Sequence, residues 1–200
     1  MTHRLLPCAL LLLAGCVNLQ PVPDNSRYHI LDHAPTPQDE PIVLETDTPH
    51  LHIAQIDLPS YHDSKKLAIR KTSTEIEFSE THRWVEPLED SISRALTSHL
   101  RSRLNPRWTF SSYPGRRSSA LGYEVQLRFT RLEGDRIGQA VIEGQLQVFE
   151  STPGLRLRTH ATFKMRRLWL EKDPAELPTL LSEMVQELGD EILKALQEAL

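Results

Sequence analysis

The histidine pair His50 and His52 is the closest that this sequence comes to a metal site. Residues two apart on a strand project from the same face, so both imidazoles could approach one ion. A zinc site takes three or four protein ligands, however, and a pair alone does not make one. We therefore expect an exposed histidine pair without metal. His99, on the apolar side of an expected helix, is interpreted as a partly buried structural residue.

Motifs of nucleophilic catalysis and phosphoryl transfer are absent from the sequence. It contains no Gly-x-Ser-x-Gly elbow, no P-loop and no His-Glu-x-x-His motif. The adjacent carboxylates Glu89 and Asp90 fall at the start of an expected helix, where a solvated cap explains them. Because no nucleophile–base pair is visible, we expect a protein that is not an enzyme and has no cofactor.

Cys16 is the residue whose chemistry is easiest to interpret. Leu-Ala-Gly at 13–15 precedes it, in which Ala14 and Gly15 are small, and the chain carries Arg4 and an apolar run at 5–14. A basic start, an apolar run and a small-residue cleavage point are typical of a secretory signal. The run is too short to span a bilayer, which takes about 20 apolar residues. We expect residues 1–15 to be a signal peptide.

The sequence Leu-Ala-Gly-Cys at 13–16 resembles the lipobox of bacterial lipoproteins. In that class the cysteine thiol receives a diacylglycerol, the signal is cut before it, and the new amine is acylated. The resemblance implies S-diacylglycerol and N-acyl (palmitate-type) chains on Cys16, and several chains anchor a protein effectively permanently. The alternative is an ordinary secretory signal with a chance cysteine. Because Cys8 leaves with the signal, the mature chain has no thiol for disulfides, metal sites or catalysis.

The remainder of the chain suits one domain on a tether. Residues 16–26 contain Pro21 and Pro23 and are expected to form an extended tether, and residues 27–200 a single periplasmic domain. The formal net charge of −4 is unlike that of nucleic-acid binders, which are normally basic. No second long apolar run is present, so the lipid is the only membrane contact that the sequence requires.

The hydrophobic pattern predicts an α+β fold. Apolar positions at helical spacing predict two amphipathic helices, and alternating or β-branched runs predict about seven strands. We expect a largely antiparallel or mixed sheet with both helices packed on one face, and a hairpin turn at Gly134-Asp135. The expected strands lie at 28–32, 51–58, 66–71, 74–79, 123–129, 140–148 and 155–165, with a further short one at 42–44, and the helices at 87–104 and 174–199.

Two groups of residues are candidates for contact with a partner. Arg156, Arg158 and Lys164 alternate with apolar residues on an expected strand, and a basic sheet face suits an acidic partner or lipid headgroups. The alternative is a solvated face. Arg83 and Trp84 are of types over-represented in interfaces, but we favour packing for Trp84 because a tryptophan buries so much area.

Segments spread along the chain resemble the ABC-type transport auxiliary lipoproteins, the PqiC-like family. They are Tyr-His-Ile-Leu-Asp at 28–32, Leu-Pro-Ser-Tyr at 58–61, Leu-Ala-Ile-Arg at 67–70 and His-Arg-Trp-Val-Glu-Pro-Leu at 82–88. The resemblance implies a non-catalytic accessory of a system that moves lipids or other hydrophobic molecules across the Gram-negative envelope. The implied partners are an MCE-domain protein and an ABC permease, and self-association into a ring fits the same role.

The resemblance also implies attachment to the outer membrane, facing the periplasm. Val17 follows Cys16, whereas in enterobacterial-type sorting an Asp there retains a lipoprotein in the inner membrane. An assembly lipoprotein that binds an outer-membrane β-barrel complex remains the alternative function. A lipid-binding domain is disfavoured because it needs a large apolar pocket and the helices look committed to the core.

Overall fold

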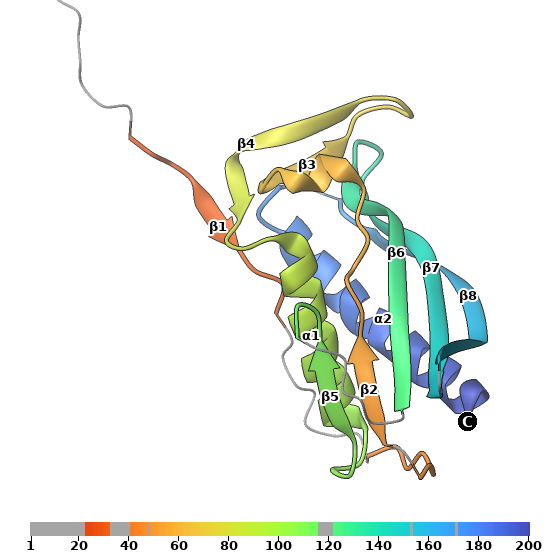
Figure 1. Cartoon of the computed structure of the whole chain (residues 1–200). Helices are drawn as coiled ribbons and strands as arrows, with labels where there is room; N and C mark the ends of the chain where they lie inside the picture. Colours follow the sequence, from red (N-terminus) through yellow and green to blue (C-terminus); the bar gives the residue numbers. More distant parts are fainter. Residues whose placement is uncertain (1–22, 33–40, 48, 116–121, 153, 171) are drawn as a thin grey trace, which may run out of the picture.

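The computed structural model describes residues 23–32, 41–47, 49–115, 122–152, 154–170 and 172–200. The predicted signal peptide, Cys16 and the first part of the tether lie outside these residues. Within them the chain forms an α+β fold with two α-helices and one eight-stranded sheet (Figure 1). The elements are β1 (Arg27–His29), β2 (His50–Ile53), the 3-10 helix η1 (Ser60–Asp63), β3 (Lys66–Arg70), β4 (Ile76–Trp84), α1 (Leu88–Arg103), β5 (Thr109–Ser112), β6 (Gly122–Asp135), β7 (Gln139–Thr152), β8 (Gly154–Leu168) and α2 (Leu177–Ala199).

The long strands β6, β7 and β8 form an antiparallel meander. They are longer than the alternating runs that predicted them. The sequence predicts the hairpin between β6 and β7 but places its turn wrongly at Gly134-Asp135. Both residues still belong to β6 and are paired with β7 or β3. The turn follows at 136–138 and ends at Gly138, whose φ of 92° is in the region that favours glycine.

β6 is the strand on which the rest of the sheet depends. Its first part pairs in parallel with β2, through Leu51 and Tyr123, and its end pairs in parallel with β3, through Arg70 and Asp135. Beyond β2 lies β5, in parallel, while β4 pairs antiparallel with β3 and β1 in parallel with β4. The sheet is therefore mixed, and it forks along one edge of β6 (Figure 1).

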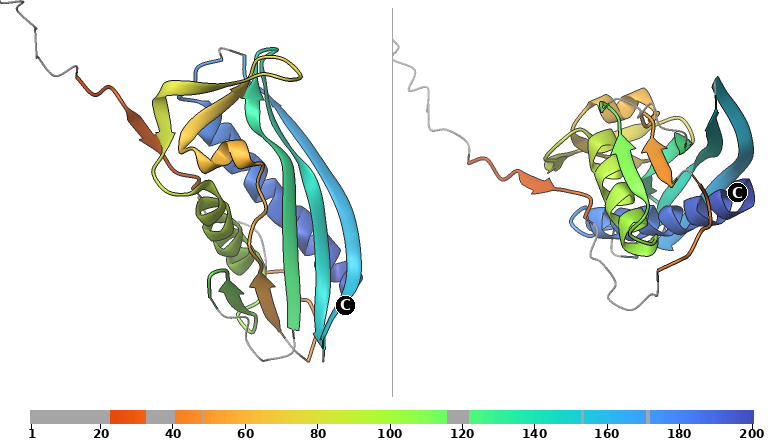
Figure 2. Two further views of the ribbon diagram at one scale, coloured as in Figure 1. Left: turned by 45° about the horizontal axis from the view of Figure 1, so that its top comes forward. Right: turned by 60° about the horizontal axis from the view of Figure 1, so that its bottom comes forward.

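Both helices lie on the inner side of the sheet, as the sequence predicts. Figure 2 shows α2 along the concave side of β6–β8, with α1 beside it. Each helix buries the apolar stripe that its 3.6-residue spacing creates, and this stripe supplies much of the core. α1 begins directly after Pro87, which needs no N–H partner there, and ends at Arg103 before an extended Leu104.

Two short segments differ from the prediction. The strand expected at 42–44 is only a single bridge, between Ile42 and Leu104. β5 was not predicted, because four residues between a proline-containing turn and a polar loop carry too little alternation to be recognised. β5 nevertheless ends one branch of the sheet and lies against α1.

Candidate functional site

The predicted basic row on β8 is split by a β-bulge. Thr159 is the Cα partner of Val148 on β7, but the next partner of β7, Phe149, is Leu157, so Arg158 is an extra residue. An extra residue in one strand reverses which side chains share a face. The expectation that Arg156, Arg158 and Lys164 form one row is therefore wrong.

The bulge leaves the three basic residues in two groups on opposite faces of β8. Arg158 donates through Nε to the carbonyl of Ala199 at the end of α2, at 3.2 Å, and through Nη1 to Glu150 at 3.3 Å. Arg156 is the cross-strand partner of Glu150 and shares its face. Lys164 lies on the opposite, outer face of the sheet.

Lys164 belongs to a cluster of cations around Glu143. Its Nζ is 3.1 Å from the Glu143 carboxylate, which also lies 3.3 Å from Arg166 and 3.7 Å from Arg131. Burial would raise the pKa of Glu143, but hydrogen bonds from Lys164 and Arg166 and the charge of Arg131 lower it overall. Lys164, Arg166 and Arg131 are thus already paired with a carboxylate of this protein. This makes the cluster a weaker candidate for binding an acidic partner.

Trp84 is a core residue, and the packing interpretation favoured from the sequence is confirmed. Its side chain is 2% exposed, and its backbone N–H donates to Lys65 O at 2.6 Å. Arg83, one residue earlier, faces the other way and is partly exposed. Arg83 therefore remains the predicted candidate of this pair, and its neighbours decide what kind of surface it belongs to.

Exposed apolar side chains surround Arg83 where the edge strand β1 pairs with the end of β4. Tyr28 is the cross-strand partner of Arg83. Ile30 lies two residues after Tyr28 and Val85 two residues after Arg83, so each is on the same side as its predecessor. All three are exposed, and we call the four residues the β1–β4 patch. Tyrosine, arginine and aliphatic side chains around an edge strand have the composition of a protein contact surface. The sequence analysis missed the three apolar members, although Tyr28 lies in a segment that carries the family resemblance.

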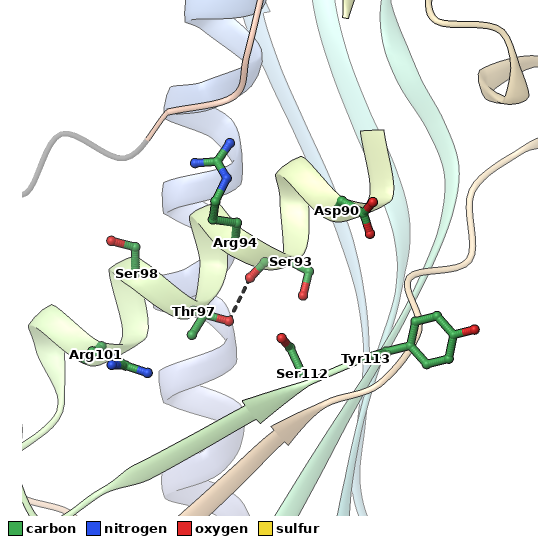
Figure 3. A pocket seen from close by; sticks show the side chains of 8 residues that line it. All are labelled: Asp90, Ser93, Arg94, Thr97, Ser98, Arg101, Ser112 and Tyr113. Atoms are coloured by element: carbon green, nitrogen blue, oxygen red, sulfur yellow. Dashed lines mark hydrogen bonds between the residues drawn. The ribbon is translucent and has the colours of Figure 1, made fainter. Parts of the chain in front are cut away.

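A second open surface is the groove between α1 and β5, with a volume of about 480 Å³. Figure 3 shows Ser93 and Thr97 of α1 directed toward Ser112 of β5, while the side chain of Arg94 turns away. The Thr97 hydroxyl donates to Ser93 O at 2.7 Å. The groove is lined largely by hydroxyl and charged groups, so it suits polar contacts and not an acyl chain.

The histidine pair bonds to β5. His50 lies 2.8 Å from the Thr109 hydroxyl and 3.1 Å from the Ser111 hydroxyl, and His52 lies 2.8 Å from Ser111. His52 is buried, which corrects the expectation of an exposed pair. The described residues contain no group of three or more His, Cys, Asp or Glu that could hold a metal ion. His99 is buried and bonds Asp190 of α2 at 2.8 Å, as its structural interpretation requires.

A buried carboxylate, Glu133, escaped the sequence analysis. It accepts hydrogen bonds from Arg70 Nε at 2.6 Å, from Arg131 Nε at 2.8 Å and from the hydroxyl of Tyr61. Burial would raise the pKa of Glu133, but these hydrogen bonds lower it overall, whereas burial and the Glu133 contact raise the pKa of Tyr61. The group joins η1 and β3 to β6, and its closed geometry points to a structural role.

The comparison with known families decides the assignment. The sequence matches the family of the ABC-type transport auxiliary lipoprotein component over residues 29–193. The chain belongs to this family. No curated protein matches the lipoprotein sequence. Among the described residues no helix is long and apolar enough to cross a bilayer.

Solved structures share the fold of the lipoprotein. The crystal structure of an uncharacterized protein matches with a TM-score of 0.67 and 16% identity, over 84% of this chain and 97% of the other. Protein XCC0632 from Xanthomonas campestris matches with a TM-score of 0.65 and 16% identity, over 85% and 94%. At this identity the likeness shows the fold alone.

Proposed function

We propose that this auxiliary lipoprotein is a non-catalytic subunit of an ABC/MCE-type system that moves lipids or other hydrophobic molecules across the Gram-negative envelope. The family match over residues 29–193 carries the proposal. The residue chemistry supports it, since the titratable groups described above serve packing, strand pairing or ion pairs. The polar α1–β5 groove also favours an accessory over a carrier of acyl chains.

The β1–β4 patch is the surface that we assign to the transport partner. It combines exposed Tyr28, Ile30 and Val85 with Arg83, and it lies immediately after the predicted tether. An anchor on Cys16 would concentrate this patch at one membrane, so that binding needs little intrinsic affinity. An MCE-domain protein that reaches that membrane is the proposed occupant.

The membrane that carries the anchor is proposed to be the outer one, with the domain in the periplasm. Val17 after Cys16 supports this location, because it lacks the aspartate that enterobacterial-type sorting uses for inner-membrane retention. Self-association at the end of the conduit belongs to the same proposal.

Crosslinking in native membranes, followed by a pull-down of the lipidated protein, tests the proposal. We expect recovery of an MCE-domain protein, lost in the Cys16→Ala variant and reduced in Arg83→Glu. Arg107→Glu makes the same charge change at an exposed residue outside the patch and serves as the control. Recovery of a β-barrel alone would reject the transport role. Equal recovery of the MCE-domain protein with Arg83→Glu and Arg107→Glu would reject the β1–β4 patch as its binding surface.

A further inference from the structure

Three large aliphatic side chains are exposed together at one end of the sheet. Ile137 is 80% exposed, Leu168 69% and Leu170 77%, the highest values among the large apolar residues described. Ile137 is in the β6–β7 turn, and the backbone N–H of Trp169 donates to Gly138 O of that turn at 2.7 Å. We call Ile137, Leu168 and Leu170 the apolar tip. Single exposed apolar residues need no explanation, but a cluster marks a contact surface.

The fold holds these side chains outward. Trp169, between two members of the tip, is 1% exposed and its indole N–H donates to Asp173 O at 2.9 Å. Side chains alternate along a strand, so the burial of Trp169 directs Leu168, the last residue of β8, away from the core, and the chain then bends at the exposed Leu170. The exposure of Leu168 is thus a consequence of the buried indole next to it.

Cationic side chains lie beside the tip. A hollow of about 230 Å³ is lined by Trp169, Arg136 and Lys172, together with Ile69, Glu77 and Asp135. Arg136 is paired with Glu77 at 2.8 Å, while Lys172 is exposed. Aliphatic side chains with long cationic side chains next to them suit the boundary between acyl chains and phosphate groups of a bilayer.

The described start of the chain, residues 23–26, lies toward the same end of the molecule. β4 begins at this end, because Arg70 pairs with both Ile76 of β4 and Asp135 of β6. β1 pairs in parallel with the last three residues of β4, from Arg27 beside His82 to His29 beside Trp84. In the left view of Figure 2 the β6–β7 turn, the end of β8 and the start of the β1 segment all lie in the upper part of the molecule.

We propose that the apolar tip inserts into the surface of the phospholipid bilayer that carries the anchor, with Lys172 at the headgroup phosphates. The occupant is a lipid surface because the tip is aliphatic, has the exposed Lys172 beside it and lies toward the same end of the molecule as the described start of the chain. This inference rests on the membrane attachment in the proposed function but not on the transport role. It gives the domain a fixed orientation on the membrane.

Site-directed fluorescence on the full lipidated protein in vesicles tests the proposal. Acylated Cys16 offers no thiol, so Leu168→Cys would provide one labelling site for an environment-sensitive dye. Leu155→Cys is the matched control, since Leu155 is 42% exposed at the opposite end of the same strand. Only protein that floats with the vesicles is measured, which separates the tip from any failure of the anchor.

With quenchers on the acyl chains, we expect quenching at residue 168 at least about threefold stronger than at 155, because inserted side chains reach ~5–10 Å into the acyl boundary. Vesicles with phosphatidylglycerol should strengthen it, and Lys172→Gln should remove that gain while Arg107→Gln keeps it. Equal quenching at both sites would overturn the proposal. So would shielding of residue 168 that appears only when a partner protein is added.

Discussion

The imidazole of His99 on α1 occupies the space that a side chain at Gly189 on α2 would need. A Cβ atom at position 189 would lie 2.4 Å from His99 Cδ2, closer than such atoms approach. The neighbouring Asp190 holds the ring through a 2.8 Å bond to Nε2. This contact sets how closely the two helices pack.

Replacement of Gly189 by alanine should destabilise the protein. In a helix interior alanine is ordinarily favoured over glycine by about 1 kcal/mol. Overpacking against His99 costs about 1–3 kcal/mol, which should outweigh that gain. Urea unfolding should show a lower midpoint for Gly189→Ala and little change for Glu198→Ala, an exposed site on the same helix. A higher midpoint for Gly189→Ala would contradict the contact.

Replacement of Glu133 by leucine should be far more damaging than loss of a surface ion pair. It would leave the partly buried Arg70 and Arg131, and Tyr61, without the fully buried carboxylate that they share. Removing one partner of a buried pair costs about 3–5 kcal/mol. Glu80→Leu breaks an exposed pair with Lys66 and is the control, with a small expected cost. Similar unfolding midpoints for the two variants would argue against the buried network.

His62 should make the stability depend on pH. Burial lowers the pKa of His62 from 6.5 to about 4, against the opposing effects of Glu133 and Asp63. Between these values the unfolded chain binds a proton that the folded chain does not, so acid favours unfolding. The expected loss on going from pH 6.5 to 4 is about 3 kcal/mol.

Unfolding free energies across this pH range test the role of His62. The variant His62→Leu should make the curve shallower, leaving the contributions of His29 and His50, whose pKa values burial also lowers, and near pH 4 those of Glu133 and Glu143, whose pKa values are lowered by their cationic partners. His160→Gln, at an exposed position, should keep the slope of the original protein. An unchanged slope in His62→Leu would exclude this residue as the cause.

Arg158 should protect the end of α2. Its Nε bonds the Ala199 carbonyl, and a cation at a helix C-terminus also opposes the helix dipole. Arg158→Ala should therefore speed amide hydrogen exchange in the last turn of α2, with a loss of about 1 kcal/mol. Lys164→Ala, on the other face of β8, should leave that exchange unchanged. Equal effects of Arg158→Ala and Lys164→Ala on this exchange would mean that the two residues share one face, against the bulge.

Periodic sequence patterns predicted the layers of this fold but not its irregular points. α1 and α2 follow from repeated apolar spacing, because a helix must bury one stripe whatever its neighbours are. The bulge at Arg158 leaves no sequence signal, since Leu155 and Leu157 continue the alternation of Phe163 while facing the other way. Burial of Glu133 depends on Tyr61, 72 residues away, and local pattern carries no information on such pairings.

The fork at β6 also determines the order in which the chain can fold. β2 and β3 reach the rest of the sheet only through β6, whose first pairing joins Leu51 to Tyr123. Contacts so distant in sequence carry a high loop-closure cost and form late. A chain released from the ribosome only as far as residue 121 could pair β1, β4 and β3 in one branch and β2 and β5 in the other, but could not join the two branches. The two branches should therefore be joined in one cooperative step only after β6 has emerged, so that folding is completed late in synthesis.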